Sequence, residues 1–152
     1  MEEIAETERR GFTLMEAFIV VIILCILSAL VVPQFSRASQ QARLSELLND
    51  LQMVRSQIEL YKIQHDDRLP GQTSVGAPVD VVQFDTSLTT RGADDLGPYL
   101  KKIPRNVFNG LDTVAIVNDS AAKPNCALNT GWWLNSATGE FRANDSVANA
   151  NY

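Results

Sequence analysis

The chain has 152 residues, which is enough for one domain of ordinary size together with a membrane segment. It has 13 Lys and Arg residues and 18 Asp and Glu residues. The resulting net charge of −5 argues against a broad basic surface for nucleic acid. Cys25 and Cys126 lie far apart along the chain. A helix around Cys25 would keep the two thiols apart, so we predict no intramolecular disulfide.

Residues 1–11 form a polar segment without helical or strand periodicity. The segment ends in Arg9, Arg10 and Gly11, directly before a long apolar run. Two interpretations stay open: a cytoplasmic tail, or a leader that is removed by cleavage. The two arginines favour a cytoplasmic N-terminus, because basic residues collect on that side of a membrane. The bulk of the chain is then expected outside.

The apolar run carries no charge from Ala17 to Ser36 and is apolar around nearly its whole circumference, with Ser28 as the main exception. Its length matches the roughly 20 residues that a membrane-spanning helix needs. A core helix of a soluble protein would show a polar face instead. We therefore predict a transmembrane helix over residues 12–36.

One carboxylate, Glu16, lies at the edge of this apolar run. A charge inside a bilayer costs on the order of 3 kcal/mol and usually has a partner. In one interpretation it is an interfacial residue, favoured near a helix N-terminus. In the other, a peptidase cuts after Gly11, and the new amine of Phe12 pairs with the Glu16 carboxylate of the same chain or of a neighbour. The second interpretation makes Glu16 an assembly residue.

The motif Gly-Phe-Thr-Leu-Met-Glu at 11–16, together with the apolar run to Pro33, resembles the class III signal motif of type IV pilins and type II secretion pseudopilins. This resemblance implies that a prepilin peptidase cuts after Gly11. It further implies that Phe12 becomes N-methylated, that Glu16 is the assembly carboxylate and that Pro33 bends the helix.

The residues that follow, 37–68, are expected to continue the same rod as an amphipathic helix. Arg55–Glu59 and Lys62–Asp66 are spaced as i,i+4 ion pairs on its exposed faces. The helix should end near Asp66, because Pro70 and Gly71 cannot continue it. Apolar residues recur on one face at helical spacing: Leu44, Leu47, Leu48, Leu51, Val54, Ile58 and Tyr61.

Residues 69–152 are predicted to form a small β-rich head, too small to bury a large core alone. We expect it to pack on the apolar stripe of the long helix, which gives an α+β, pilin-like fold with a small antiparallel sheet. The pattern at 79–90 is compatible with either a strand or a short helix. Residues 96–102 are predicted to form one helical turn. The tail 144–152 is expected to fray.

The strand signals come late in the chain. The β-branched run 113–117 predicts one strand. The segments 131–135 and 140–143 flank a Gly-containing turn and predict a hairpin. Trp132 and Trp133 should point to opposite faces: one onto the helix, the other exposed or buried against a neighbouring subunit.

The head also resembles that of major pseudopilins, through Tyr-Leu-Lys-Lys-Ile-Pro at 99–104 and the Gly-Trp…Thr-Gly-Glu stretch at 131–140. Because no disulfide closes a C-terminal loop, the resemblance favours a pseudopilin or minor pilin over an adhesive major pilin. Major pseudopilins bind calcium in the head. The resemblance therefore makes Asp112, Asp119 and Asp145 candidate oxygen ligands for calcium in this chain.

The sequence shows no nucleophile elbow, no phosphate-binding glycine loop and no Cys or His cluster with metal spacing. Its one histidine, His65, falls at a predicted helix end, where it caps carbonyls or faces solvent. An enzymatic activity is therefore not expected, nor is a cofactor other than calcium.

These patterns predict a structural subunit of a pilus or pseudopilus, most simply of a type II secretion system. It would sit in the bacterial inner membrane as a single-pass protein, with a cytoplasmic N-terminus and an extracytoplasmic head, before entering a filament in the cell envelope. Its expected partners are the membrane, prepilin peptidase, other pilin-like subunits through helix packing, and the assembly platform. The alternatives are a signal-anchored enzyme or binding domain, and a type IV pilin for adhesion or DNA uptake.

Overall fold

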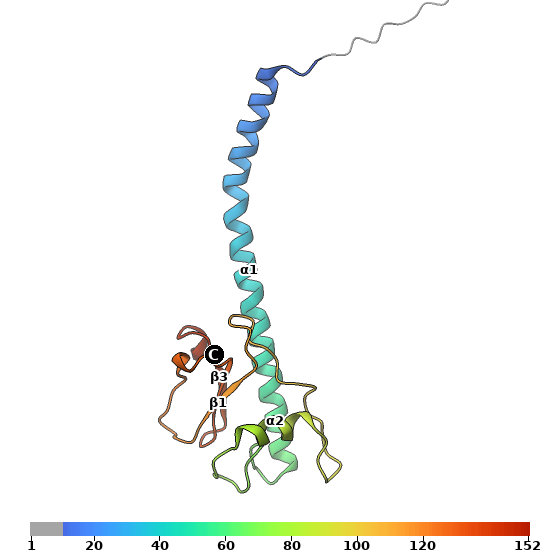
Figure 1. Ribbon diagram of the computed structural model, residues 1–152, viewed down its shortest axis with the longest axis vertical. Helices are drawn as coiled ribbons and strands as arrows, with labels where there is room; N and C mark the ends of the chain where they lie inside the picture. Colours follow the sequence, from blue (N-terminus) through green and yellow to red (C-terminus); the bar gives the residue numbers. More distant parts are fainter. Residues whose placement is uncertain (1–10) are drawn as a thin grey trace, which may run out of the picture. The chain divides into compact units, whose positions relative to one another are not determined.

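The structure is a computed structural model that describes residues 11–152, with the backbone alone at positions 30, 32 and 33. The predicted leader therefore lies outside the described residues, except for Gly11. The chain divides into two compact units, Met1–Gln41 and Ala42–Tyr152, and each is described by itself. The long helix α1 (Leu14–Gln64) begins in the first unit and ends in the second (Figure 1).

In the first unit, every described side chain of α1 is exposed except Ala17, which is half-exposed. By length and composition, α1 contains a segment apolar enough to cross a membrane. The hydroxyl of Ser28 donates to the Leu24 carbonyl at 2.7 Å, so this polar group is satisfied within the helix. The helix continues through Pro33, and the predicted bend there stays a prediction.

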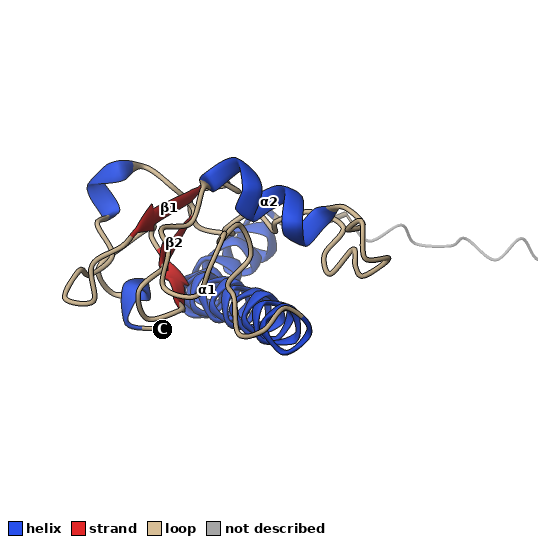
Figure 2. Cartoon of the chain, turned by 90° about the horizontal axis from the view of Figure 1, so that it is seen from below, coloured by secondary structure: helices blue, strands red, loops and turns tan. Residues whose placement is uncertain are grey.

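The second unit is an α+β head, as predicted. The last part of α1 is followed by α2 (Val81–Thr89), and Asp80 caps α2 by accepting a hydrogen bond from the Gln83 N–H at 2.9 Å. Three short strands complete the head beside the two helices (Figure 2). They are β1 (Val114–Val117), β2 (Trp132–Asn135) and β3 (Glu140–Ala143), with the single turns η1 (Cys126–Leu128) and η2 (Asn149–Asn151).

The strand order is β1-β2-β3, and β2 and β3 form the predicted hairpin, with Leu134 opposite Phe141. The sheet is mixed rather than wholly antiparallel, because β1 pairs parallel with β2, Ile116 opposite Leu134. Two parallel neighbours need a connection of a dozen residues or more, and the long loop between β1 and β2 supplies it.

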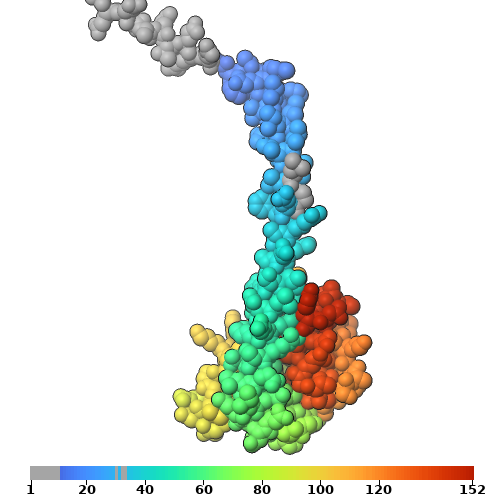
Figure 3. All heavy atoms as spheres, turned by 180° about the vertical axis from the view of Figure 1, so that it is seen from behind, coloured from blue at the N-terminus to red at the C-terminus, as the bar shows by residue number. Residues whose placement is uncertain are grey.

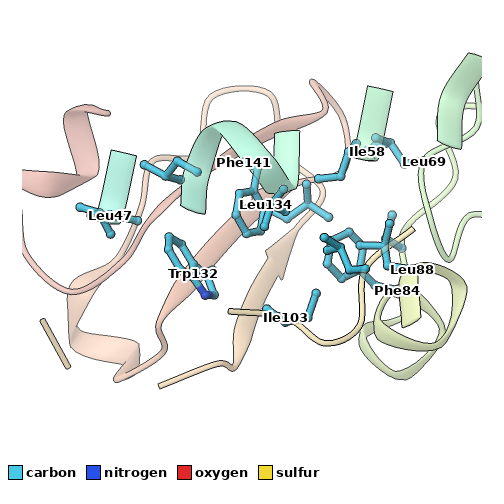
Figure 4. Close-up of a cluster of buried hydrophobic side chains, with 14 residues drawn as sticks. Leu47, Ile58, Leu69, Phe84, Leu88, Ile103, Trp132, Leu134 and Phe141 are labelled. Carbon is cyan, nitrogen blue, oxygen red and sulfur yellow. The ribbon is translucent and has the colours of Figure 1, made fainter. Parts of the chain in front are cut away.

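The core forms where one stripe of α1 meets α2 and the sheet (Figure 4). The ring centroids of Trp132 and Phe141 lie 5.5 Å apart, and the Phe141 and Phe84 rings stack at 6.5 Å. Leu48, which the spacing assigned to this stripe, is instead 39% exposed. The predicted stripe is otherwise confirmed, with four residues that are at most 1% exposed: Leu47, Leu51, Val54 and Ile58.

Trp133 points away from this core, yet it is only 1% exposed within its own head. Arg142 lies opposite Trp133 in the β2–β3 register and so shares its face. The Arg142 guanidinium donates to the Ala150 carbonyl at 3.1 Å, which holds the C-terminal segment beside this face. The prediction that the second tryptophan is exposed or covered by another subunit was therefore wrong.

The tail 144–152 is packed rather than frayed. Asn144 is fully buried, and its amide donates to the Thr130 hydroxyl at 2.7 Å. Arg55 on α1 donates to the Phe141 carbonyl at 2.7 and 2.9 Å and also to the carbonyl of Tyr152. The predicted Arg55–Glu59 pair is replaced by these bonds, and Lys62 pairs with Glu59 at 3.3 Å.

The segment 96–102 does not form the predicted helical turn. Gly97 adopts a positive φ of 77°, and the following Pro98 disfavours helical geometry for its predecessor. The backbone N–H groups of Tyr99 and Leu100 instead both donate to the Leu88 carbonyl at 2.9 Å, which closes the end of α2. The ambiguous segment 79–90 is resolved as the helix α2.

Replacing Arg55 with Met should lower the free energy of unfolding of the head by about 2 kcal/mol, because the carbonyls of Phe141 and Tyr152 lose a charged donor. Urea denaturation of the full chain in detergent micelles, followed by tryptophan fluorescence, measures this, since both tryptophans lie in the head. Arg43→Met, at an exposed position of the same helix, is the control. Equal stability of both variants would contradict the role given to Arg55.

Burial raises the pKa of Asp50, and Glu46 one turn earlier on α1 adds to the rise. The folded state thus holds this proton more tightly than the unfolded chain, so stability falls as the pH rises through the pKa of Asp50. Asp50→Asn should therefore stabilise the head by about 0.5 kcal/mol near neutral pH, by removing a like-charge pair. The gain should vanish at about pH 3, where the carboxyl is protonated in both states. The same urea titrations at the two pH values measure it, and a gain independent of pH would contradict this account.

Candidate processing and assembly site

The junction between Gly11 and Phe12 lies outside the helix, in exposed backbone. A Cβ added at Gly11 would meet no atom within 4 Å, and Phe12 is 71% exposed. A peptide bond of this kind is open to an enzyme that approaches from solvent or from the membrane surface. The geometry is compatible with cleavage at the predicted position, and cleavage itself stays a prediction.

Thr13 starts the helix. Its hydroxyl oxygen accepts a hydrogen bond from the Glu16 backbone N–H at 3.2 Å, and its carbonyl accepts one from Ala17 at 3.1 Å. These are the bonds of a helix N-cap, and Thr-x-x-Glu is the sequence signature of a capping box. Thr13 was not among the predicted site residues, although this signature at 13–16 indicates a helix cap. Because Thr13 follows the junction, a chain that begins at Phe12 keeps its cap.

Glu16 lies in the first turn of α1, where the unpaired N–H groups of the helix favour a negative charge. It is exposed, and among the described residues no cation pairs with it. Its surroundings are apolar, with Met15 65% and Phe18 58% exposed. The site therefore presents a carboxylate without a described partner within one turn of the residue that cleavage would make N-terminal.

The apolar side chains of α1 that follow Glu16 are exposed. Ile19, Ile23 and Leu27 are 46%, 50% and 52% exposed, and none of the membrane-length segment is buried. Figure 3 shows the segment of the helix to which these residues belong, in blue. An apolar surface of this extent is not left in water and marks contact with lipid or with other apolar helices.

The head does not bring the three calcium candidates together. Asp112 pairs with Arg105 at 3.3 Å, and the Asp119 carboxylate accepts from the Ala121 N–H at 2.9 Å. Asp145 accepts from the amides of Asn106 and Asn149 at 2.9 and 2.7 Å. Within residues 11–152 no three acidic, His or Cys side chains cluster as metal ligands would.

An exposed Gly–Phe junction, a capped apolar helix and a small head packed on the end of that helix together define a pilin-like protein. The chain is 38% identical over 97 residues to type II secretion system core protein G of Pseudomonas aeruginosa, covering 64% of this chain and 66% of the relative. It is 32% identical over 74 residues to the protein of the same name from Dickeya chrysanthemi, covering 49% of this chain and 48% of the relative.

A further relative is the ComG operon protein 3 homolog of Bacillus licheniformis, 27% identical over 66 residues, which covers 43% of this chain and 68% of the relative. The chain thus spans about half to two thirds of the length of the curated relatives that it matches. No family model and no solved structure matches it. The chain belongs to the family of type IV pilins and type II secretion pseudopilins.

Thr13→Val should loosen the start of α1, because the Glu16 N–H loses its acceptor at a cost of about 1 kcal/mol. Amide hydrogen exchange of residues 14–18 in micelles should then be about fivefold faster. Ser28→Ala, which removes a hydroxyl bonded within the helix, should leave that first turn unchanged. Unchanged exchange in the Thr13 variant would show that the hydroxyl does not cap the helix.

Proposed function

We propose that this chain is a structural subunit of a pseudopilus, the filament of a type II secretion system, and that it assembles through α1. The observation that carries the proposal is an uncovered apolar helix with a carboxylate in its first turn, directly after an exposed Gly–Phe junction. The relatives named core protein G support the choice of secretion system.

Processing by prepilin peptidase is the first step of this proposal. Cleavage after Gly11 releases the leader and gives Phe12 a free amine, which is then methylated. The amine keeps a positive charge after a single methylation, so it can still pair with a carboxylate. Cleavage thus converts one unpaired anion at the start of the helix into a potential ion pair.

Assembly follows from that pair. An isolated charge is costly in hydrocarbon, and an ion pair between neighbouring chains removes the cost for both partners. The amine of one subunit and Glu16 of the next satisfy each other only when two helices lie side by side in register. The apolar surface of α1 then packs against other subunits, which extracts it from lipid.

The topology completes the proposal. The N-terminus faces the cytoplasm and the head lies outside the inner membrane, where subunits wait before entering a filament in the cell envelope. Prepilin peptidase, the secretion platform and other pilin-like subunits are the partners. We assign no catalytic step, because the one histidine, His65, uses both ring nitrogens in contacts within the head.

Glu16→Gln should be cleaved and methylated normally but should reduce filament assembly at least tenfold, because the amine of the neighbouring subunit loses its anion. Mass analysis of the N-terminal peptide from the native membrane measures processing, and shearing of filaments from cells that overproduce the protein measures assembly. Glu46→Gln, an exposed carboxylate on the same helix, is the matched control.

Two outcomes would contradict the proposal. Wild-type peptide that still begins at Met1, in cells with an active prepilin peptidase, would leave a plain membrane anchor. Normal filaments from the Glu16 variant would remove Glu16 from assembly even if Phe12 were found methylated.

A further inference from the structure

The strand β1 forms one edge of the sheet, because the strand order is β1-β2-β3 and β1 pairs only with β2. Successive residues of a strand turn their main-chain N–H and C=O groups to alternate edges. The Thr113 carbonyl accepts from the Trp132 N–H at 3.0 Å. The Val117 carbonyl accepts from the Ser136 N–H at 2.8 Å. Every second residue of the segment 113–117 therefore faces β2.

The main-chain groups of Val114 and Ile116 point the other way, to the outer edge. Within residues 11–152, no other segment donates to them or accepts from them. Natural edge strands are commonly protected from further pairing by a lysine, a proline or a bulge. The sequence of β1 is Val-Ala-Ile-Val, and its pairing with β2 runs without a bulge. The outer edge of β1 thus presents a row of unused main-chain donors and acceptors.

An apolar pocket of about 340 Å³ lies beside this edge, between β1, the first turns of α2 and residues 102–103. Val81, Phe84, Ile103 and Val114 supply its apolar wall. The Val114 side chain packs against the core, so the pocket lies on the same side of the sheet as the core. Val81 is 50% exposed, which leaves this wall accessible from solvent. The pocket is suited to an apolar side chain.

Charge does not select what enters this pocket. The charged residues around it carry both signs: Asp85, Lys102 and Asp112. Asp112 is paired with Arg105 at 3.3 Å, outside the apolar wall. The chemistry of an occupant is therefore set by the main-chain groups of β1 and by the apolar wall. An extended backbone matches the first, and an apolar side chain matches the second.

We propose that β1 accepts an extended polypeptide segment of a partner protein as a fourth strand, antiparallel to β1, with an apolar side chain in the pocket beside Val81. Strand addition takes its affinity from main-chain hydrogen bonds and its specificity from pockets for alternate side chains. Antiparallel pairing is the more stable arrangement per residue. In it, the residues opposite Val114 and Ile116 exchange hydrogen bonds with them and place their side chains on the pocket side.

A second copy of this chain does not suit the edge. α1 packs along the face of the sheet, and antiparallel pairing of two β1 strands needs a two-fold axis normal to that face. The two α1 helices would then run in opposite directions, which two chains with the proposed membrane topology cannot do. The β3 edge of a neighbour is not free either, because Arg55 donates to the Phe141 carbonyl at 2.7 and 2.9 Å.

The test uses the full chain in detergent micelles and the peptide acetyl-Ser-Val-Ser-Val-Ser-amide. In the free chain, the amide hydrogens of Val114 and Ile116 should exchange with solvent faster than those of Ala115 and Val117, which face β2. The peptide should bind with roughly millimolar affinity. At about 10 mM it should slow the exchange of Val114 and Ile116 about fivefold and shift their NMR signals.

Two N-methylated forms of the peptide separate main-chain binding from side-chain binding. A methyl group on the nitrogen of the first valine removes a donor that faces β1 in the antiparallel arrangement, so binding should weaken about tenfold. A methyl group on the nitrogen of the central serine removes a donor that points away from β1. That peptide should bind as tightly as the unmodified one.

Val81→Asp places a charge in the apolar wall and should weaken binding of the peptide about tenfold. The head should stay folded, because Val81 begins α2, where a carboxylate is favoured. Val82→Asp is the matched control, since Val82 lies in the same turn, is 74% exposed and does not line the pocket. It should bind the peptide as the wild type does. Tryptophan fluorescence confirms that both variants are folded.

Three results would overturn the proposal: unchanged exchange of Val114 and Ile116 at about 10 mM peptide, equal binding of the two N-methylated peptides, or unchanged binding by folded Val81→Asp. A chain that is dimeric in micelles, with slow exchange of Val114 and Ile116 before any peptide is added, would assign the edge to a second copy and overturn the assignment to a partner protein.

Discussion

The burial of one stripe of α1 is the interaction on which the rest of the head depends. Three strands of four residues each expose too much of their surface to form a core by themselves. The four leucine, valine and isoleucine side chains that α1 inserts are at most 1% exposed, and each contributes roughly 2 kcal/mol by leaving water. The sheet, α2 and the C-terminal segment are arranged around these apolar side chains of α1.

Arg55 fixes the register in which α1 packs against the sheet. Apolar side chains tolerate sliding along a helix, whereas bonds from one guanidinium to the carbonyls of Phe141 and Tyr152 hold one register. The cost of desolvating this cation lowers its pKa, with Arg142 adding to the effect. The C-terminal residues thereby become part of the fold.

The sequence was sufficient where a feature rests on a local pattern. The helix stripe, the hairpin around Gly139 and the β1 run follow from periodicity and turn chemistry. It was insufficient where distant segments compete for the same group. The Arg55–Glu59 spacing is correct for a helical pair, but a carbonyl from β3 takes the guanidinium instead. The parallel pairing of β1 and the packed tail likewise depend on contacts that no local window contains.

The candidate site divides in the same way. Gly11, Phe12 and Glu16 were predicted as site residues from their spacing, because a short motif beside an apolar run is a local signal. The three calcium candidates were chosen only as acidic side chains, and the structure holds each of them in separate contacts of the head.

The position of the helix cap has a consequence for how such a chain tolerates change. Thr13 supplies the acceptor that starts α1, and it lies after the Gly11–Phe12 junction. The hydrogen bonds that start the helix therefore lie within the portion of the chain that cleavage would leave. A segment of different length or charge before the junction, or one taken from another protein, would therefore leave the Thr13 cap in place.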